Sequence, residues 1–203
     1  MNHYRSLHPN HVHQLMVSAS KHYFEGKDGL LKYQKKDFEV ALGTIGEKDR
    51  RHMVTLSLRD HCSAIFYAEI AFGPELPDVY AFLRRAWSPK PDHVLQGLPV
   101  ILTVPESVER AFPGLSSNID RLGVEVLSVT SGFQGGVRDI HTIESSLGMA
   151  IGKKTEEARA WLKNSLRFNA TQKARTGVVT KAELWTNGVP PLKALPANWP
   201  NAA

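Results

Sequence analysis

One glutamate falls inside an apolar helical pattern, where a carboxylate could do chemistry. Residues 139–151 carry aliphatic side chains at the three- and four-residue spacing of one helix face: Ile140, Ile143, Leu147 and Ile151. With Ile140 set at zero, Glu144 lies at about 40° around that helix, within the apolar stripe. A carboxylate there needs a basic partner, a metal ion or a polar cleft beside the core. A nearby Lys or Arg is the simplest of these partners.

The elements that must position Glu144 are strands first and helices later. Five segments have the apolar or alternating pattern of strands: residues 12–24, 53–58, 64–70, 98–104 and 124–129. Helical spacing follows Asp78, continues on both sides of Pro113, and returns after Thr155, which is expected to cap the last helix. This order predicts an α/β fold with a mixed five-stranded sheet. Three antiparallel strands are followed by two parallel strands, with helices on both faces.

Three segments break this regular pattern. Residues 25–51 are polar and rich in lysine, and we expect a hairpin or insertion with a short strand at 38–42. Residues 131–139 form a Gly-rich loop ahead of the Glu144 helix. After Thr176 the chain is rich in proline and weakly periodic. We therefore expect a core over residues 1–175 and an extended tail over 176–203, docked by Trp185 and Trp199.

Composition limits the class of protein. The chain has 203 residues, enough for one buried domain, and its net charge of +5 permits a polyanionic partner without requiring one. Cys62 is the only cysteine, so an internal disulfide is impossible and a reducing, cytoplasmic location is expected. No apolar run is long enough to cross a bilayer, and no membrane partner is expected.

Four stretches within residues 9–175 carry local sequence motifs: PNHVHQLMVSA, LRDHCSAIFYAEI, LPVILTVPES and LGVEVLSVTSGFQGGVRDIHTIESSLG. In the order given, they resemble four motifs of one family. These motifs are the first strand, the hairpin turn, the fourth strand, and the fifth strand with the mobile loop and the glutamate-bearing helix that follow it. That family is the RNase H-like catalytic core of DDE transposases and retroviral-type integrases. The resemblance implies a nucleic-acid partner and phosphoryl-transfer ancestry.

In that family three carboxylates hold two divalent metal ions, which activate the nucleophile for strand transfer. Matched position by position, the first acid falls on Met16, the second on Val104 and the third on Glu144. Thioether and isopropyl groups do not ligate Mg²⁺, which takes oxygen ligands at about 2.1 Å. The resemblance therefore implies a degenerate member that needs no metal cofactor. It would serve as a DNA-binding, regulatory or assembly module of a mobile element.

A rearranged acid set is the alternative, and it would restore a requirement for Mg²⁺ or Mn²⁺. Three acids could take part: Asp60, Glu106 and Asp139. Each also has a structural explanation. Asp60 would form a turn, Glu106 would lie in the first turn of a helix, and Asp139 would cap a helix. A zinc site built from the N-terminal histidines is a further option, although exposed strand histidines are common. They are His3, His8, His11 and His13.

Basic residues near the last helices are the candidates for contacts with DNA phosphates: Lys153, Lys154, Arg159, Lys163, Arg167, Lys173 and Arg175. In the family this region lies close to DNA. The alternative is a solvated helix face on which Glu156 and Glu157 pair with nearby bases. The lysines of the 25–51 insertion are expected to be solvated. A third possibility is a protein-binding subunit, either a homodimer or a partner of a transposition-machinery protein.

Overall fold

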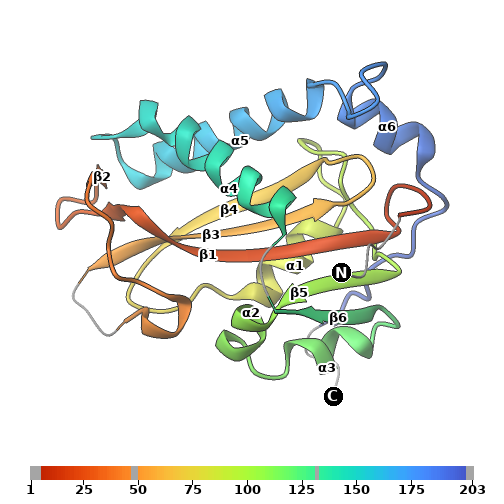
Figure 1. Cartoon of the computed structure of the whole chain (residues 1–203), viewed down its shortest axis with the longest axis horizontal. Coiled ribbons are helices and arrows are strands. Elements are labelled where there is room, and N and C mark those ends of the chain that lie inside the picture. The colour runs from red at the N-terminus through yellow and green to blue at the C-terminus, as the bar shows by residue number, and fades with distance from the viewer. Residues whose placement is uncertain (1–5, 47–49, 131–132, 200–203) are drawn as a thin grey trace.

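A computed structural model of the chain describes residues 6–46, 50–130 and 133–199. A mixed β-sheet crosses the centre of the molecule and carries helices on both faces (Figure 1). The described strands are β1 (Val12–Glu25), β2 (Leu31–Tyr33), β3 (Arg51–Asp60), β4 (Phe66–Phe72), β5 (Ile101–Pro105) and β6 (Glu125–Val129). The described α-helices are α1 (Val79–Trp87), α2 (Glu106–Ala111), α3 (Leu115–Asp120), α4 (Gln134–Leu147), α5 (Thr155–Thr171) and α6 (Lys181–Gly188).

The strand order is β4-β3-β1-β5-β6, and β2 pairs separately with the end of β1. β1, β3 and β4 are antiparallel, whereas β5 and β6 run parallel to β1. The predicted arrangement of three antiparallel and two parallel strands is therefore confirmed. β2 adds a sixth strand inside the predicted insertion. The short strand predicted at 38–42 is wrong, because Leu42 instead begins the 3-10 turn η1 (Leu42–Thr44).

The face that carries α1, α2 and α3 holds the larger core. Leu15 and Val17 of β1 point toward it, since successive side chains of a strand alternate between faces. Phe82 and Leu83 of α1 are fully buried there, and the Asp78 side chain caps that helix as predicted. The helical region also breaks between α2 and α3 as expected, around Pro113 and Gly114.

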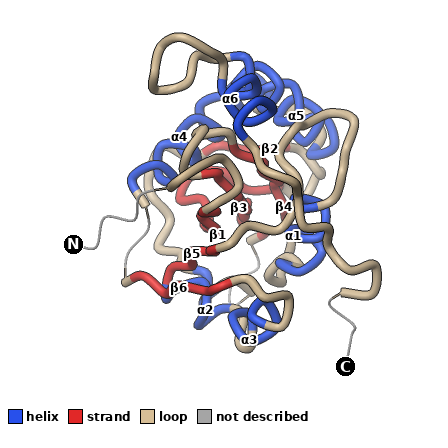
Figure 2. The backbone as a smooth tube through the Cα atoms, turned by 90° about the vertical axis from the view of Figure 1, so that its right-hand side faces the viewer, coloured by secondary structure: helices blue, strands red, loops and turns tan. Residues whose placement is uncertain are grey.

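α4 and α5 cover the opposite face of the sheet (Figure 2). Ile143 and Leu147 of α4 are buried as the apolar stripe predicted, but the helix ends at Leu147 and leaves Ile151 exposed. α4 also begins earlier than expected, at Gln134, so most of the predicted Gly-rich loop is helical; residues 131–132 lie outside the described range. Thr155 is the first residue of α5 rather than its cap, and its hydroxyl donates to Glu25 Oε1.

The C-terminal segment docks on the body of the fold through both tryptophans. Trp185 and Trp199 are 2% and 4% exposed in the larger core, and the Trp185 ring lies 6.0 Å from the His13 ring. The expectation of a fully extended tail is wrong, because α6 lies within it. Residues 200–203 lie outside the described range. No helix in the described part of the chain is long and apolar enough to span a membrane.

Candidate functional site

A pocket of about 380 Å³ lies between the middle of β1 and α4, on the helix face predicted to bear the glutamate. The residues that give it its chemistry are Met16, Ser18, His22, Asp37, His141 and Glu144. Met16 and Ser18 of β1 reach this pocket because their side chains point away from the sheet face that holds Leu15 and Val17. Met16 and Glu144 are thus brought together, as the sequence predicted.

Glu144 is held by hydroxyl groups of β1. Ser20 Oγ donates a 2.6 Å hydrogen bond to Glu144 Oε1, and the Tyr23 hydroxyl donates at 2.9 Å to the Glu144 backbone carbonyl. Burial, with a further contribution from the Glu144 charge, raises the pKa of Tyr23. Within the described structure Glu144 has no ion pair, so the expected Lys or Arg partner is replaced by a serine.

Met16 packs directly beneath α4. A Cβ atom placed on Gly136 would overlap Met16 Cγ, so the helix backbone packs directly against this side chain. Met16 is 9% exposed. The position matched to the family's first acid is therefore filled by an apolar side chain in close contact with the helix that bears Glu144.

Val104 does not join Met16 and Glu144. β1 and β5 are aligned with Gln14 opposite Thr103, so Val104 lies on the same sheet face as Leu15. It is fully buried in the core beneath α1, α2 and α3. The expected convergence of all three matched positions is therefore not observed.

Asp60 supports the turn that joins β3 to β4. It lies opposite His13 in the strand register, at the start of β1. Its carboxylate accepts hydrogen bonds from the Asn10 amide at 2.9 Å and from the amide and hydroxyl of Ser63, both at 2.6 Å. Burial raises the pKa of Asp60 against the opposing effect of these hydrogen bonds. This geometry is that of a structural turn residue.

The other two candidate acids are also placed away from Glu144's carboxylate. Glu106 occupies the first turn of α2, as expected, 4.0 Å from Arg110. Asp139 is inside α4, so its predicted capping role is wrong; the helix starts five residues before it. Asp139 instead accepts a 2.6 Å hydrogen bond from Arg59 Nη1, and burial raises its pKa although Arg59 opposes the shift. No pattern in the sequence indicates this pairing.

The seven basic residues predicted to contact DNA lie in different environments. Arg159 lies 3.7 Å from Glu156, and Arg167 donates to Asp92 at 2.5 Å, so both have acidic neighbours. Lys153 and Lys154 lie in the connection between α4 and α5, beside β2. The remaining three are exposed on or just after α5: Lys163, Lys173 and Arg175.

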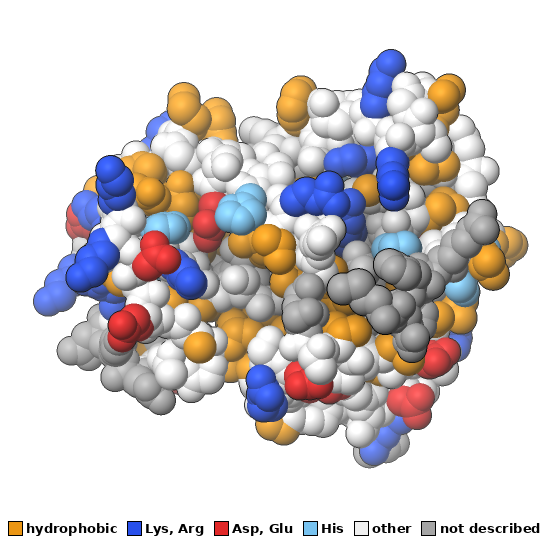
Figure 3. All heavy atoms as spheres, in the orientation of Figure 1, with side chains coloured by type: hydrophobic (Ala, Val, Ile, Leu, Met, Phe, Trp, Pro, Cys, Tyr) orange, Lys and Arg blue, Asp and Glu red, His pale blue; other side chains and the backbone are white. Residues whose placement is uncertain are grey.

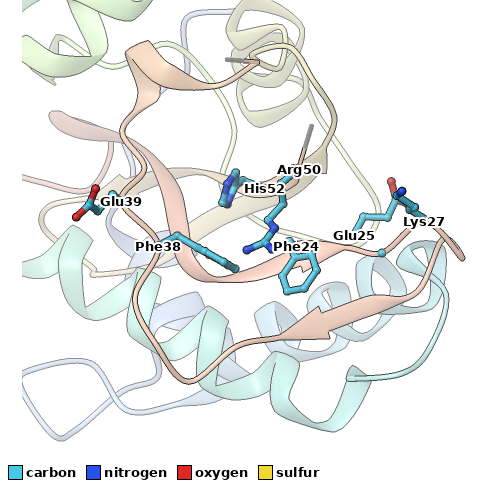
Figure 4. Close-up of a pocket in the computed structure, with 8 residues that line it drawn as sticks. Phe24, Glu25, Lys27, Phe38, Glu39, Arg50 and His52 are labelled. Carbon is cyan, nitrogen blue, oxygen red and sulfur yellow. The ribbon is translucent and has the colours of Figure 1, made fainter. Parts of the chain in front are cut away.

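An aromatic pocket near the end of β1 is occupied by the chain's own cation. Phe24 and Phe38 flank the Arg50 guanidinium, whose central carbon lies 4.8 and 4.3 Å from the two ring centres (Figure 4). The Phe38 ring also meets the His52 ring edge-on at 4.8 Å. Cation–π attraction of this kind stabilises the insertion against β1 and leaves Arg50 committed to the fold.

No family model and no curated protein matches the chain. Solved structures do match it. The HTLV-2 integrase catalytic core domain in complex with magnesium, in its trimeric form, is 13% identical, with 89% of this chain and 99% of that chain covered and a TM-score of 0.54. Its dimeric form is 14% identical over the same shares, with a TM-score of 0.51. The fold is RNase H-like.

A larger assembly gives a similar match. The simian T-cell lymphotropic virus intasome in complex with PP2A regulatory subunit B56 gamma is 13% identical, covers 97% of this chain and 62% of that chain, and has a TM-score of 0.51. At such low identity these likenesses describe the fold. The RNase H-like fold implied by the family resemblance is thereby confirmed.

The residues that line the pocket beside Glu144 do not fit a carboxylate-held pair of magnesium ions. Besides Glu144, Asp37 is the only carboxylate that lines the pocket in the described structure, and it lies 3.8 Å from Lys21 and 3.7 Å from His22. Among residues 6–46, 50–130 and 133–199, no three His, Cys, Asp or Glu side chains are arranged to hold a metal ion.

Among the described residues, the N-terminal histidines likewise do not gather at one metal position. The rings of His8 and His11 lie 5.2 Å apart, whereas His13 is fully buried and accepts a hydrogen bond from Trp87 Nε1. His3 lies outside the described residues. Burial, with a smaller contribution from Lys90, lowers the pKa of His13 to about 3, so this imidazole is neutral in the folded protein.

Proposed function

We propose that this chain is an integrase-like core that has lost metal-dependent strand transfer and binds DNA as a regulatory or assembly module. The observation that carries this proposal is Met16, which shares a pocket with Glu144 at the position matched to an acid. Two-metal phosphoryl transfer needs oxygen ligands from several carboxylates at about 2.1 Å. A thioether under a closely packed helix cannot supply them.

The other acids do not replace the missing ligand. Asp60 and Asp139 are buried and committed to the β3–β4 turn and to Arg59 respectively. Glu106 follows the last residue of β5 and begins α2, where the helix dipole stabilises its charge. The hydroxyl of Ser20 donates to Glu144, an interaction that holds the carboxylate without a cation.

DNA is the partner that the charge distribution supports best. The chain carries a net charge of +5, and the described structure exposes several lysines that have no ion pair. Contacts of lysine with phosphate release counterions, so the logarithm of the affinity falls with the logarithm of salt concentration, by roughly 0.9 per duplex phosphate neutralised. Binding of this kind requires no divalent metal.

Plasmid cleavage and DNA binding, measured side by side, test this function. We expect supercoiled plasmid to remain intact in Mn²⁺ or Mg²⁺, and we expect labelled DNA to bind in EDTA with an affinity that drops steeply between about 50 and 200 mM salt. Metal-dependent cleavage that Glu144→Gln abolishes would instead establish an active enzyme. Absence of any DNA binding at low salt, together with a dimer in light scattering, would favour a protein-binding subunit.

A further inference from the structure

A second surface, remote from Glu144 in the sequence, surrounds β2. An open hollow of about 630 Å³ lies there, and its size is within the roughly 300–1,000 Å³ of small-ligand pockets. The side chains that define it are Phe24, Lys27, Lys32, Tyr33 and Ile151. We call these five residues, together with the adjoining Lys153 and Lys154, the β2 surface. It combines aromatic and aliphatic walls with lysine ammonium groups.

Backbone hydrogen bonds fix the two halves of the β2 surface to each other. The Leu31 amide donates to the Lys153 carbonyl, and the Gly152 amide donates to the Leu31 carbonyl, both at 2.8 Å. Leu30 forms a further antiparallel bridge with Lys154. The β2 turn and the α4–α5 connection are therefore joined into one surface, although more than a hundred residues separate them in sequence.

The aromatic ring of Tyr33 packs against two other rings of the fold. Its ring centre lies 5.2 Å from that of Tyr23 and 5.6 Å from that of His22. Tyr33 is nevertheless 46% exposed, and Ile151 is 44% exposed. An aromatic ring that is both held in place and open to solvent can stack against a flat partner at little cost in side-chain entropy.

The charges of the β2 surface are unbalanced. Lys27, Lys153 and Lys154 are exposed and have no carboxylate within ion-pair distance among the described residues. The local acids are already used, since Asp28 pairs with Lys32 at 2.7 Å and Glu25 pairs with Arg51 at 2.7 Å. In Figure 3, Lys and Arg side chains gather around hydrophobic side chains at this end of the molecule.

We propose that the β2 surface binds single-stranded nucleic acid. An unpaired base would stack on Tyr33 and fill the hollow beside Ile151, while Lys27, Lys153 and Lys154 would neutralise flanking phosphates. A duplex offers phosphates but keeps its bases stacked inside, so it would use the lysines and not the ring. This inference rests on the proposed function, because it names the nucleic-acid form and the site within the same chain.

Fluorescence anisotropy in EDTA, with a labelled oligothymidylate and a duplex of the same length, tests this site. Tyr33→Ala is expected to weaken binding of the single strand about tenfold, within the range measured for loss of a base-stacking side chain, while Tyr33→Phe retains it. Lys27→Ala is expected to weaken binding and to lower the salt slope by roughly 0.7, the value for one phosphate of a single strand. Melting curves of each variant establish that it is folded.

Two matched variants serve as controls. Phe168→Ala removes an aromatic side chain that is 70% exposed on α5, and Arg121→Ala removes an exposed charge next to α3. Both are expected to bind as the wild-type protein does. Equal affinity of Tyr33→Ala and wild type for the single strand would overturn the inference, as would equally effective competition by polyglutamate.

The test separates this inference from the proposed function. If Lys163→Ala weakens DNA binding while the Tyr33 and Lys27 variants do not, the site on β2 is wrong and DNA binding through α5 stands. If the wild-type protein binds neither single strand nor duplex, the proposed function fails and the β2 site fails with it. Tyr33- and Lys27-dependent binding that favours the single strand supports both.

Discussion

Arg59 and Asp139 form a buried ion pair that joins β3 to α4. Arg59 Nη1 lies 2.6 Å from Asp139 Oδ1, and the two side chains are 16% and 6% exposed. Gly135 lies against the same guanidinium, since a Cβ atom there would be 2.9 Å from Arg59 Nε. The pair therefore fixes where α4 crosses the sheet, and with it the position of Glu144.

Asp139→Ala is expected to destabilise the protein by about 3 kcal/mol, because it leaves the Arg59 guanidinium largely buried without its counter-charge. Urea unfolding measures this loss. Replacing both partners, as Arg59→Met with Asp139→Leu, should cost less than Asp139→Ala alone, because no uncompensated charge then remains. A double variant that is less stable than the single one would contradict this account of the pair.

Gly136→Ala is expected to destabilise the protein by about 1–3 kcal/mol, since the new methyl group would overlap Met16. The same change in a Met16→Ala background should cost less, and a double-mutant cycle measures that coupling. Gly148→Ala is the matched control, because nothing lies within 4 Å of its Cβ position. Equal effects at the two glycines would show that α4 does not rest on Met16.

Acid should destabilise the fold through its buried histidines. Burial lowers the pKa of His13 to about 3 and that of His93 to about 4, with Lys90 adding to both shifts. Because the folded pKa lies below the unfolded value, the contribution to stability is complete above about pH 6.5 and is lost as pH falls toward about 3. From His13 alone, the free energy of unfolding should be about 2 kcal/mol lower at pH 5 than above the unfolded pKa.

His13→Gln isolates the pH-dependent contribution of His13 to the free energy of unfolding. Glutamine can still accept the hydrogen bond from Trp87, but it does not titrate. The difference in unfolding free energy between wild type and variant, measured by urea titration across this range, should shrink as pH falls. A constant difference would mean that His13 has the same pKa in the folded and the unfolded protein.

Removal of residues 176–203 is expected to abolish cooperative unfolding, because Trp185 and Trp199 belong to the main core. Loss of one buried tryptophan side chain costs about 3–5 kcal/mol, a large part of the stability of a domain this size. Near-ultraviolet circular dichroism and thermal melting measure the effect. Val178→Ala, at a residue 82% exposed, should change neither signal. A stable fragment 1–175 would instead support the division into core and tail predicted from the sequence.

The succession of strands and helices along the chain and the apolar stripe beside Glu144 were predictable, because each depends on short-range hydropathy patterns. The start of α4 was not. Gly135 and Gly136 indicate a loop by helix propensity, yet both lie inside the helix. The reason is tertiary, since Arg59 and Met16 occupy the space where Cβ atoms would lie.

Two other differences have separate causes. The apolar run that contains Val104 has no alternation, so only its alignment with β1 reveals which face the side chain takes. α6 did carry a signal, the Thr180-x-x-Glu183 capping box, in which the Glu183 amide donates to Thr180 Oγ1 at 3.1 Å and the Thr180 amide to Glu183 Oε2 at 2.8 Å. The prolines that follow it favoured an extended tail, so this helix was not predicted.

Trp185 covers His13 from the far end of the chain. β1 precedes α6 along the chain, so the His13 imidazole cannot be enclosed until α6 has been synthesised. Contacts between segments so distant in sequence slow folding, and they leave the central strand β1 open on this face until α6 is present. Enclosure of His13 should therefore be a late step in the folding of this protein.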